Sequence, residues 1–223
     1  MNCDGPWIAG IDFPFGQSST FISNIGWPTS WRDYVAHVSN MSRTEFRLAL
    51  DKYRVGRPYG DKEHRRKTDV LASSISPQKL YGVPVALMFY EGAPRLLASG
   101  VTVPALTAGD PDRIVVEAYP GALARHLIGK EKYKDDNKKN QSRAQYDARL
   151  TIVCRLRQGD ILPTHGVRVV VDDSIADDPG ADDLDALLCV VQAAAACLRR
   201  QDQFGCPDNL VPEEGWIAEP TIY

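Results

Sequence analysis

Four acidic side chains stand where apolar stretches of the sequence begin or end. Asp12 follows the apolar run at 7–11, and Glu117 closes a second run that is rich in β-branched residues. Asp182 and Asp185 are three positions apart at the start of an apolar, alanine-rich segment, and this spacing places both side chains on one face of a helix. Carboxylate oxygens are hard ligands, and no cysteine or histidine pair has metal-binding spacing. The acids therefore favour Mg²⁺ or Mn²⁺ as a bound cation.

Each of these acids also has a purely structural explanation. Asp12 can close a turn through the backbone. Glu117 can pair with Arg113 or Arg125, and aspartates at the start of a helix are favoured by the helix dipole and as caps. None of these explanations predicts acids at the ends of two strands together with a pair at a helix start. The joint pattern therefore favours a shared metal site.

The elements that must position these acids can be predicted from hydrophobic periodicity and turn residues. Strands are expected at 7–12, 94–103 and 114–118. Helices are expected at 28–39, at 42–53, at 77–92 with an interruption at Pro84, from 120 onward, at 141–157 and at 182–200. Asp12 and Glu117 would then lie at the carboxyl ends of strands, where ligands gather in open α/β sheets. The last helix is apolar on almost every side and is expected to be buried.

Composition places the chain among globular proteins with a sizeable core. Its 223 residues are 43% hydrophobic and 25% charged, which suits one large domain or one domain with an insertion. The net charge of -3 excludes a uniformly basic surface, so a polyanion could bind only at a local basic patch. Five widely spaced cysteines are typical of reduced thiols, and no signal or membrane-spanning stretch is visible. The sequence therefore predicts a cytoplasmic protein.

Several short segments, spread over residues 6–220, carry a family resemblance. They are Gly10-Ile11-Asp12, HRRKTD (64–69), SPQKLYGVP (76–84), Val116-Glu117-Ala118-Tyr119-Pro120, Asp182-x-x-Asp185-Ala186-Leu187 and Glu214-Gly215-Trp216-Ile217. They resemble a family of predicted nucleases with a ribonuclease H-like fold, catalogued as domain of unknown function 429. The resemblance implies an α/β fold with a mixed sheet flanked by helices, in a single domain over 1–223 with a helical insertion at 17–93. It also implies that Asp12, Glu117, Asp182 and Asp185 are the catalytic residues and the metal ligands.

A site of this kind would perform metal-dependent hydrolysis of a phosphodiester. Two divalent ions about 3.5–4 Å apart would activate a water molecule and stabilise the leaving oxygen. The stretch at 54–67 has six basic and two acidic residues, and we expect it to hold a phosphate backbone. The candidate substrate-binding residues are Arg57, Arg65, Arg66 and Lys79.

Three other functions fit the same sequence. A non-catalytic module of this fold could bind nucleic acid or a protein partner without a metal. A nucleotide or sugar phosphotransferase of the same superfold would hold phosphate in the loop FPFGQSS (13–19), although Pro14 removes one backbone donor and the loop has only one glycine. A hydrolase of small phosphate esters would need a compact pocket. The choice between DNA, RNA and a nucleotide stays open, as does the oligomeric state.

Overall fold

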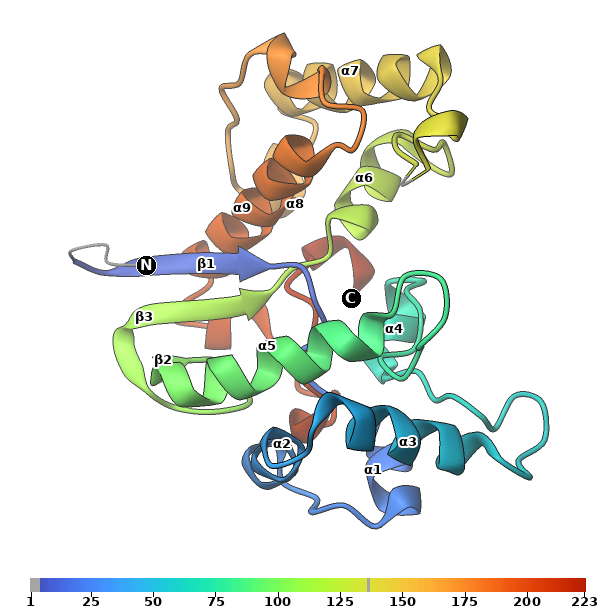
Figure 1. Cartoon of the computed structure of the whole chain (residues 1–223). Helices are drawn as coiled ribbons and strands as arrows, with labels where there is room; N and C mark the ends of the chain where they lie inside the picture. The colour runs from blue at the N-terminus through green and yellow to red at the C-terminus, as the bar shows by residue number, and fades with distance from the viewer. Residues whose placement is uncertain (1–4, 136) are drawn as a thin grey trace. The chain divides into compact units, whose positions relative to one another are not determined.

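The chain folds into two compact units. The computed structural model describes residues 5–135 and 137–223 (Figure 1). Unit 1 comprises Met1–Glu117 and Cys206–Ile217, and unit 2 comprises Ala118–Gly205 and Ala218–Tyr223. Within the described ranges, no helix combines the length and the apolar character needed to cross a membrane.

Unit 1 contains a sheet of three parallel strands in the order β1-β3-β2. The strands are β1 (Trp7–Ile11), β2 (Val101–Thr102) and β3 (Asp110–Glu117). The register pairs Trp7 with Arg113 and Ile11 with Glu117, so β1 and β3 end side by side. The predicted strands at 7–12 and 114–118 are confirmed. Because the strands are parallel, the residues that follow β1 and β3 leave the sheet at the same edge.

Five helices of unit 1 separate β1 from β2. They are α1 (Ser19–Ile25), α2 (Trp31–Ser39), α3 (Arg43–Arg54), α4 (Lys67–Leu71) and α5 (Val85–Ser99). Ser42 and Glu45 form a reciprocal capping box at the start of α3, with N···O distances of 2.7 and 3.2 Å. The predicted helices at 28–39 and 42–53 are confirmed. Helices α1–α4 lie in the range 17–93, where the family resemblance implies an insertion.

The predicted ribonuclease H-like mixed sheet is wrong. All three strands in the described part of the chain are parallel. The range 94–103, predicted as a strand, is helical up to Ser99, because leucine, arginine and alanine are strong helix formers and continue α5 past Pro94. Gly100 ends the helix with a φ of 69°, which leaves only Val101 and Thr102 for β2. The segment after β1 forms helices, so no antiparallel hairpin adjoins that strand.

The core of unit 1 is rich in aromatic residues. In Figure 1, α5 lies between the sheet and the group formed by α1, α2 and α3. Residues from all these elements belong to one buried cluster, which includes Phe21, Trp31, Phe46, Phe89 and Val115. Burial of such large side chains stabilises the unit and fixes the carboxyl edge of the sheet against the helices.

Unit 2 is helical. Its main helices are α6 (Pro120–Ile128), α7 (Arg143–Gln158), α8 (Leu162–His165) and α9 (Asp182–Leu198). The predicted helices that begin near residues 120, 141 and 182 are confirmed. Leu123, Ile152 and Leu184 belong to its buried core. The expectation that the last helix is buried on almost every side is wrong, because Val190 and Leu198 of α9 are exposed.

Candidate functional site

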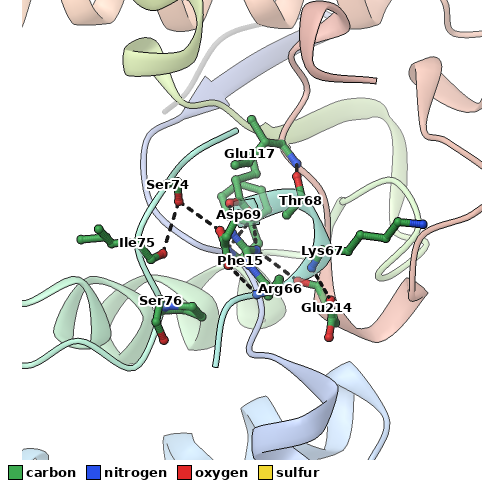
Figure 2. Close-up of polar contacts among 12 residues, drawn as sticks. Phe15, Arg66, Lys67, Thr68, Asp69, Ser74, Ile75, Ser76, Glu117 and Glu214 are labelled. Atoms are coloured by element: carbon green, nitrogen blue, oxygen red, sulfur yellow. Dashed lines mark hydrogen bonds and ion pairs between the residues drawn. The ribbon is translucent and has the colours of Figure 1, made fainter. Parts of the chain in front are cut away.

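Arg66, the residue before α4, is the centre of a buried cluster of charges in unit 1. It is 1% exposed. Its Nε donates to Asp69 Oδ2 at 2.9 Å, and its Nη1 donates to Glu117 Oε2 at 2.8 Å and to the Glu214 carbonyl at 3.1 Å. Its Nη2 donates to Asp69 Oδ1 at 2.8 Å and to Glu117 Oε1 at 2.6 Å (Figure 2). A guanidinium has five N–H donors, so every donor of Arg66 has an acceptor.

Glu117, the last residue of β3, is bound at both oxygens. Besides the two bonds from Arg66, its Oε2 accepts from the Phe15 N–H at 2.9 Å. Burial raises the pKa of Glu117, while the guanidinium of Arg66 and the Phe15 N–H oppose this rise. Burial by itself would lower the pKa of Arg66, but the carboxylates of Asp69 and Glu117 raise it well above its ordinary value. The arginine therefore stays charged in the folded protein.

Asp69 holds Arg66 by local geometry. It lies in the first turn of α4, three residues after Arg66, and its Oδ2 also accepts from the Arg66 backbone N–H at 2.9 Å. The Ser74 hydroxyl donates to Asp69 Oδ1 at 3.2 Å. The same carboxylate therefore caps the helix and pairs with the arginine, which fixes the direction in which the guanidinium leaves the backbone.

Glu214 brings the C-terminal part of unit 1 to the same place. Its Oε1 accepts from the Ser19 N–H at 2.7 Å and the Ser19 hydroxyl at 2.8 Å, and its Oε2 accepts from the Lys67 N–H at 3.1 Å. A Cβ on Gly16 would lie 2.3 Å from the Glu214 carbonyl oxygen, so this close approach requires glycine. Hydrogen bonds around Arg66 thus connect three parts of unit 1: the loop after β1, the start of α4 and the segment around Glu214.

Asp12 is in a different environment from Glu117. It directly follows β1 and is exposed. Because Ile11 pairs with Glu117, Asp12 leaves the sheet beside the end of β3. Of the two predicted acids in unit 1, one is therefore on the surface and the other is buried in an ion-pair network.

Asp182 and Asp185 belong to unit 2. Asp182 begins α9 and is exposed, and its backbone N–H donates to Asp178 Oδ2 at 2.7 Å. Asp185 is buried, and its Oδ1 accepts from the Tyr133 hydroxyl at 2.8 Å. The Lys134 ammonium forms an ion pair with Asp185 Oδ2. The buried acid of this pair is therefore bound by a cation of its own unit, as Glu117 is in unit 1.

Glu117 and Asp185 as arranged do not fit a divalent cation. Both oxygens of Glu117 are held by a guanidinium, and Asp185 is held by an ammonium and a phenol. Among the residues that the structure describes, no group of three or more His, Cys, Asp or Glu side chains is placed to hold a metal ion. The four-acid site of Asp12, Glu117, Asp182 and Asp185 stays a prediction.

The predicted substrate-binding residues of unit 1 differ in their availability. Arg66 is buried, and all five of its N–H donors already bind protein acceptors. Arg57 pairs with Asp61 at 2.6 Å, and its guanidinium carbon lies 4.0 Å from the centre of the Tyr53 ring. Lys79 is half-buried, and Arg65 is exposed. Of the four, Arg65 is the one most open to a polyanion.

The loop at 13–19 is closed by protein groups. Its backbone N–H groups at Phe15, Gln17 and Ser19 donate to Glu117, the Tyr34 hydroxyl and Glu214, respectively. Burial raises the pKa of Tyr34, whose hydroxyl donates to the Glu213 carbonyl at 2.6 Å. These three N–H groups, which a phosphate cradle could use, already bind acceptors inside unit 1.

Unit 2 has a buried polar network that the sequence did not indicate. His165 Nε2 lies 3.1 Å from Glu219 Oε1, and its Nδ1 lies 2.8 Å from the Thr164 hydroxyl. Gln192 Nε2 donates to Glu219 Oε2 at 2.7 Å. Burial alone would raise the pKa of Glu219, but the hydrogen bond and charge of His165, helped by Gln192 and Thr221, lower it overall. Glu219 is therefore held as a carboxylate inside unit 2.

Sequence reasoning also missed the link between Arg66 and Glu117. The partners are 51 residues apart, and the predicted partners of Glu117 were Arg113 and Arg125. Arg113 pairs instead with Asp110 at 2.8 Å. The Arg-x-x-Asp spacing in HRRKTD indicates only the pairing of Arg66 with Asp69, since positions i and i+3 meet on a helix.

Comparison of the chain with protein-family models, with curated proteins and with solved structures gives no match in any of the three.

Proposed function

We propose that unit 1 binds single-stranded nucleic acid through the segment Arg54–Val83 and needs no metal to do so. The observation that carries this proposal is the presence of exposed tyrosine rings among basic side chains. Tyr59 is fully exposed and Tyr81 is 64% exposed. Lys79 Nζ lies 5.2 Å from the centre of the Tyr81 ring. Exposed aromatic rings next to cations suit bases that stack and phosphates that bind beside them.

The charges of this segment favour an anionic partner. Lys62 and Arg65 are exposed. The two acidic residues next to them, Asp61 and Glu63, are paired with Arg57 and Arg54. In Figure 1 the loop between α3 and α4, which carries these residues, extends away from the end of α3. A local excess of positive charge on an exposed loop can bind phosphates although the whole chain is mildly acidic.

The test is fluorescence anisotropy of labelled single-stranded and duplex oligonucleotides with EDTA present. We expect the single strand to bind more tightly. Tyr59→Ala should weaken binding by about fivefold or more, because stacking on an aromatic ring contributes about 1–3 kcal/mol per base. Arg65→Ala should weaken binding of all sequences and reduce the slope of log K against log salt by about 1.

Arg95→Ala is the matched control, because it removes an exposed cation from α5, outside the proposed segment. It should leave the affinity unchanged. Equal losses in Arg95→Ala and Arg65→Ala would show a general charge effect. Absence of binding, or binding that ignores Tyr59, would contradict the proposal and leave a protein partner as the alternative.

Metal-dependent phosphodiester hydrolysis is a second candidate function. The observation that favours it is the position of Asp12, which is exposed where β1 and β3 end together. The test is cleavage of single-stranded and plasmid DNA in Mg²⁺ or Mn²⁺. Cleavage that Asp12→Asn abolishes, in a variant that still folds and binds, would establish this function. If no such cleavage is observed, nucleic-acid binding is the only one of the two candidate functions that is left.

A cytoplasmic location belongs to the same proposal. Of the cysteines in the described part of the chain, Cys154, Cys197 and Cys206 are free thiols. Cys3 lies outside the described residues. Free thiols persist in reducing compartments, and this supports the location expected from the sequence.

A further inference from the structure

We infer that the Arg66 guanidinium takes the place of a divalent cation in unit 1, and that its removal opens a metal site between Asp69 and Glu117. The inference is independent of nucleic-acid binding. It follows from the disagreement between Glu117 as a predicted metal ligand and the arginine that in fact binds both of its oxygens. In the natural protein, Glu117 and Asp69 then need no metal.

The oxygens around the guanidinium are of the kind that bind hard cations. Two carboxylates and the carbonyl of Glu214 converge on Arg66 at distances of 2.6–3.1 Å. They come from α4, from the end of β3 and from the segment around Glu214, so three distant parts of unit 1 meet at one positive charge (Figure 2). Carboxylate and carbonyl oxygens are also the ligands that Mg²⁺ and Mn²⁺ prefer.

The guanidinium excludes a metal from the natural protein. Arg66 is almost completely buried, and both carboxylates bind it through two oxygens. A divalent cation at Glu117 would have to lie beside a fixed positive charge and take over an oxygen that already accepts from Arg66. Both requirements oppose metal binding while the arginine is present.

Removal of the arginine side chain reverses this situation. In Arg66→Ala, the carboxylates of Asp69 and Glu117 are buried without a counter-charge, which is strongly unfavourable. The vacated volume is lined by those carboxylates and the Glu214 carbonyl. Mn²⁺, with water molecules completing its coordination, restores the charge balance that the guanidinium supplied.

The experiment is thermal unfolding with and without Mn²⁺, followed by tryptophan fluorescence. All four tryptophans, Trp7, Trp27, Trp31 and Trp216, belong to unit 1, so the signal excludes ions bound by the aspartate-rich segment at 171–185 of unit 2. We expect no Mn²⁺ effect on the Tm of the natural protein. Arg66→Ala should gain roughly 5–10 °C when Mn²⁺ is at about 100 times its Kd. The double variant Arg66→Ala/Glu117→Gln should gain nothing.

Three results would overturn the inference. The first is a Mn²⁺-dependent rise in the natural protein that Glu117→Gln removes, because the metal would then bind Glu117 beside Arg66. The second is a folded Arg66→Ala variant whose Tm ignores Mn²⁺. If Arg66→Ala does not fold in EDTA, it should refold when Mn²⁺ is added. Failure to refold in Mn²⁺ is the third contradicting result.

Discussion

Unit 1 and unit 2 each bury a glutamate, but they bind it with different nitrogen-bearing side chains. Glu117 is bound by the Arg66 guanidinium, and Glu219 by the His165 imidazole. A guanidinium keeps its charge at any ordinary pH, whereas an imidazole is charged only when it is protonated. The pKa of Glu117 is raised by burial, and that of Glu219 is lowered chiefly by His165 against the effect of burial. The comparison shows that a buried acidic side chain can be bound by a basic side chain of the same unit. A buried acid therefore does not by itself indicate a metal site.

The largest expected effect comes from Arg66→Met, which removes the permanent cation from unit 1. Asp69 and Glu117 would be left buried without a counter-charge, so the free energy of unfolding should fall by about 3–5 kcal/mol. Urea unfolding followed by tryptophan fluorescence measures this change in unit 1. A loss below about 1 kcal/mol would mean that water reaches the carboxylates and that the network contributes little.

Glu219→Gln tests the titratable side of the comparison. The pKa of Glu219 in the folded protein lies below its ordinary value of 4.5. Its stabilising contribution is therefore present above that value and is lost as the pH falls through the lowered one. The variant should be less stable at neutral pH by about 1–3 kcal/mol and should lose less stability on acidification.

The measurement for Glu219→Gln is amide hydrogen exchange of α9, read at a series of pH values from 7 down to about 3. Gln192, which donates to Glu219, lies on this helix. Identical pH dependence in the variant and the natural protein would show that Glu219 does not set the acid sensitivity of unit 2.

The smallest effect is expected from Arg95→Met, the same substitution as at Arg66 but at an exposed site. Arg95 pairs with Glu91 at 2.8 Å on the surface of α5, and its side chain is 73% exposed. Exposed pairs of this kind contribute little, so the free energy of unfolding should change by less than about 0.5 kcal/mol. If Arg66→Met and Arg95→Met reduced the free energy of unfolding by similar amounts, burial of the arginine would not explain its contribution to stability.

Local signals in the sequence were enough to predict several elements. β1 and β3 were found from short apolar runs, and α3 from the capping box at Ser42 and Glu45, because these signals act within a few residues. The expected strand at 94–103 was wrong, because α5 continues past Pro94 to Ser99 and is capped by Gly100. Helix propensity and the position of the glycine decided this boundary.

The arrangement of the candidate site could be predicted only in part. The sequence identified Glu117 as an acid at the end of a strand, and this position is confirmed. It did not identify Arg66 as the partner, because a bond across 51 residues is set by tertiary packing. The buried pairing of His165 with Glu219 could not be predicted from the sequence for the same reason, since these residues are 54 positions apart. Residue type and local spacing therefore suggest which groups can do chemistry, and the cation beside each acid must be found in the fold.

The most direct test of the central claim is a crystal of the natural protein soaked in Mn²⁺ and examined for anomalous scattering around Glu117. We predict no anomalous peak there, with the Arg66 guanidinium bound to both oxygens of Glu117. A peak within bonding distance of a Glu117 oxygen, whether Arg66 stays bound or is displaced, would contradict the claim that the arginine replaces the metal.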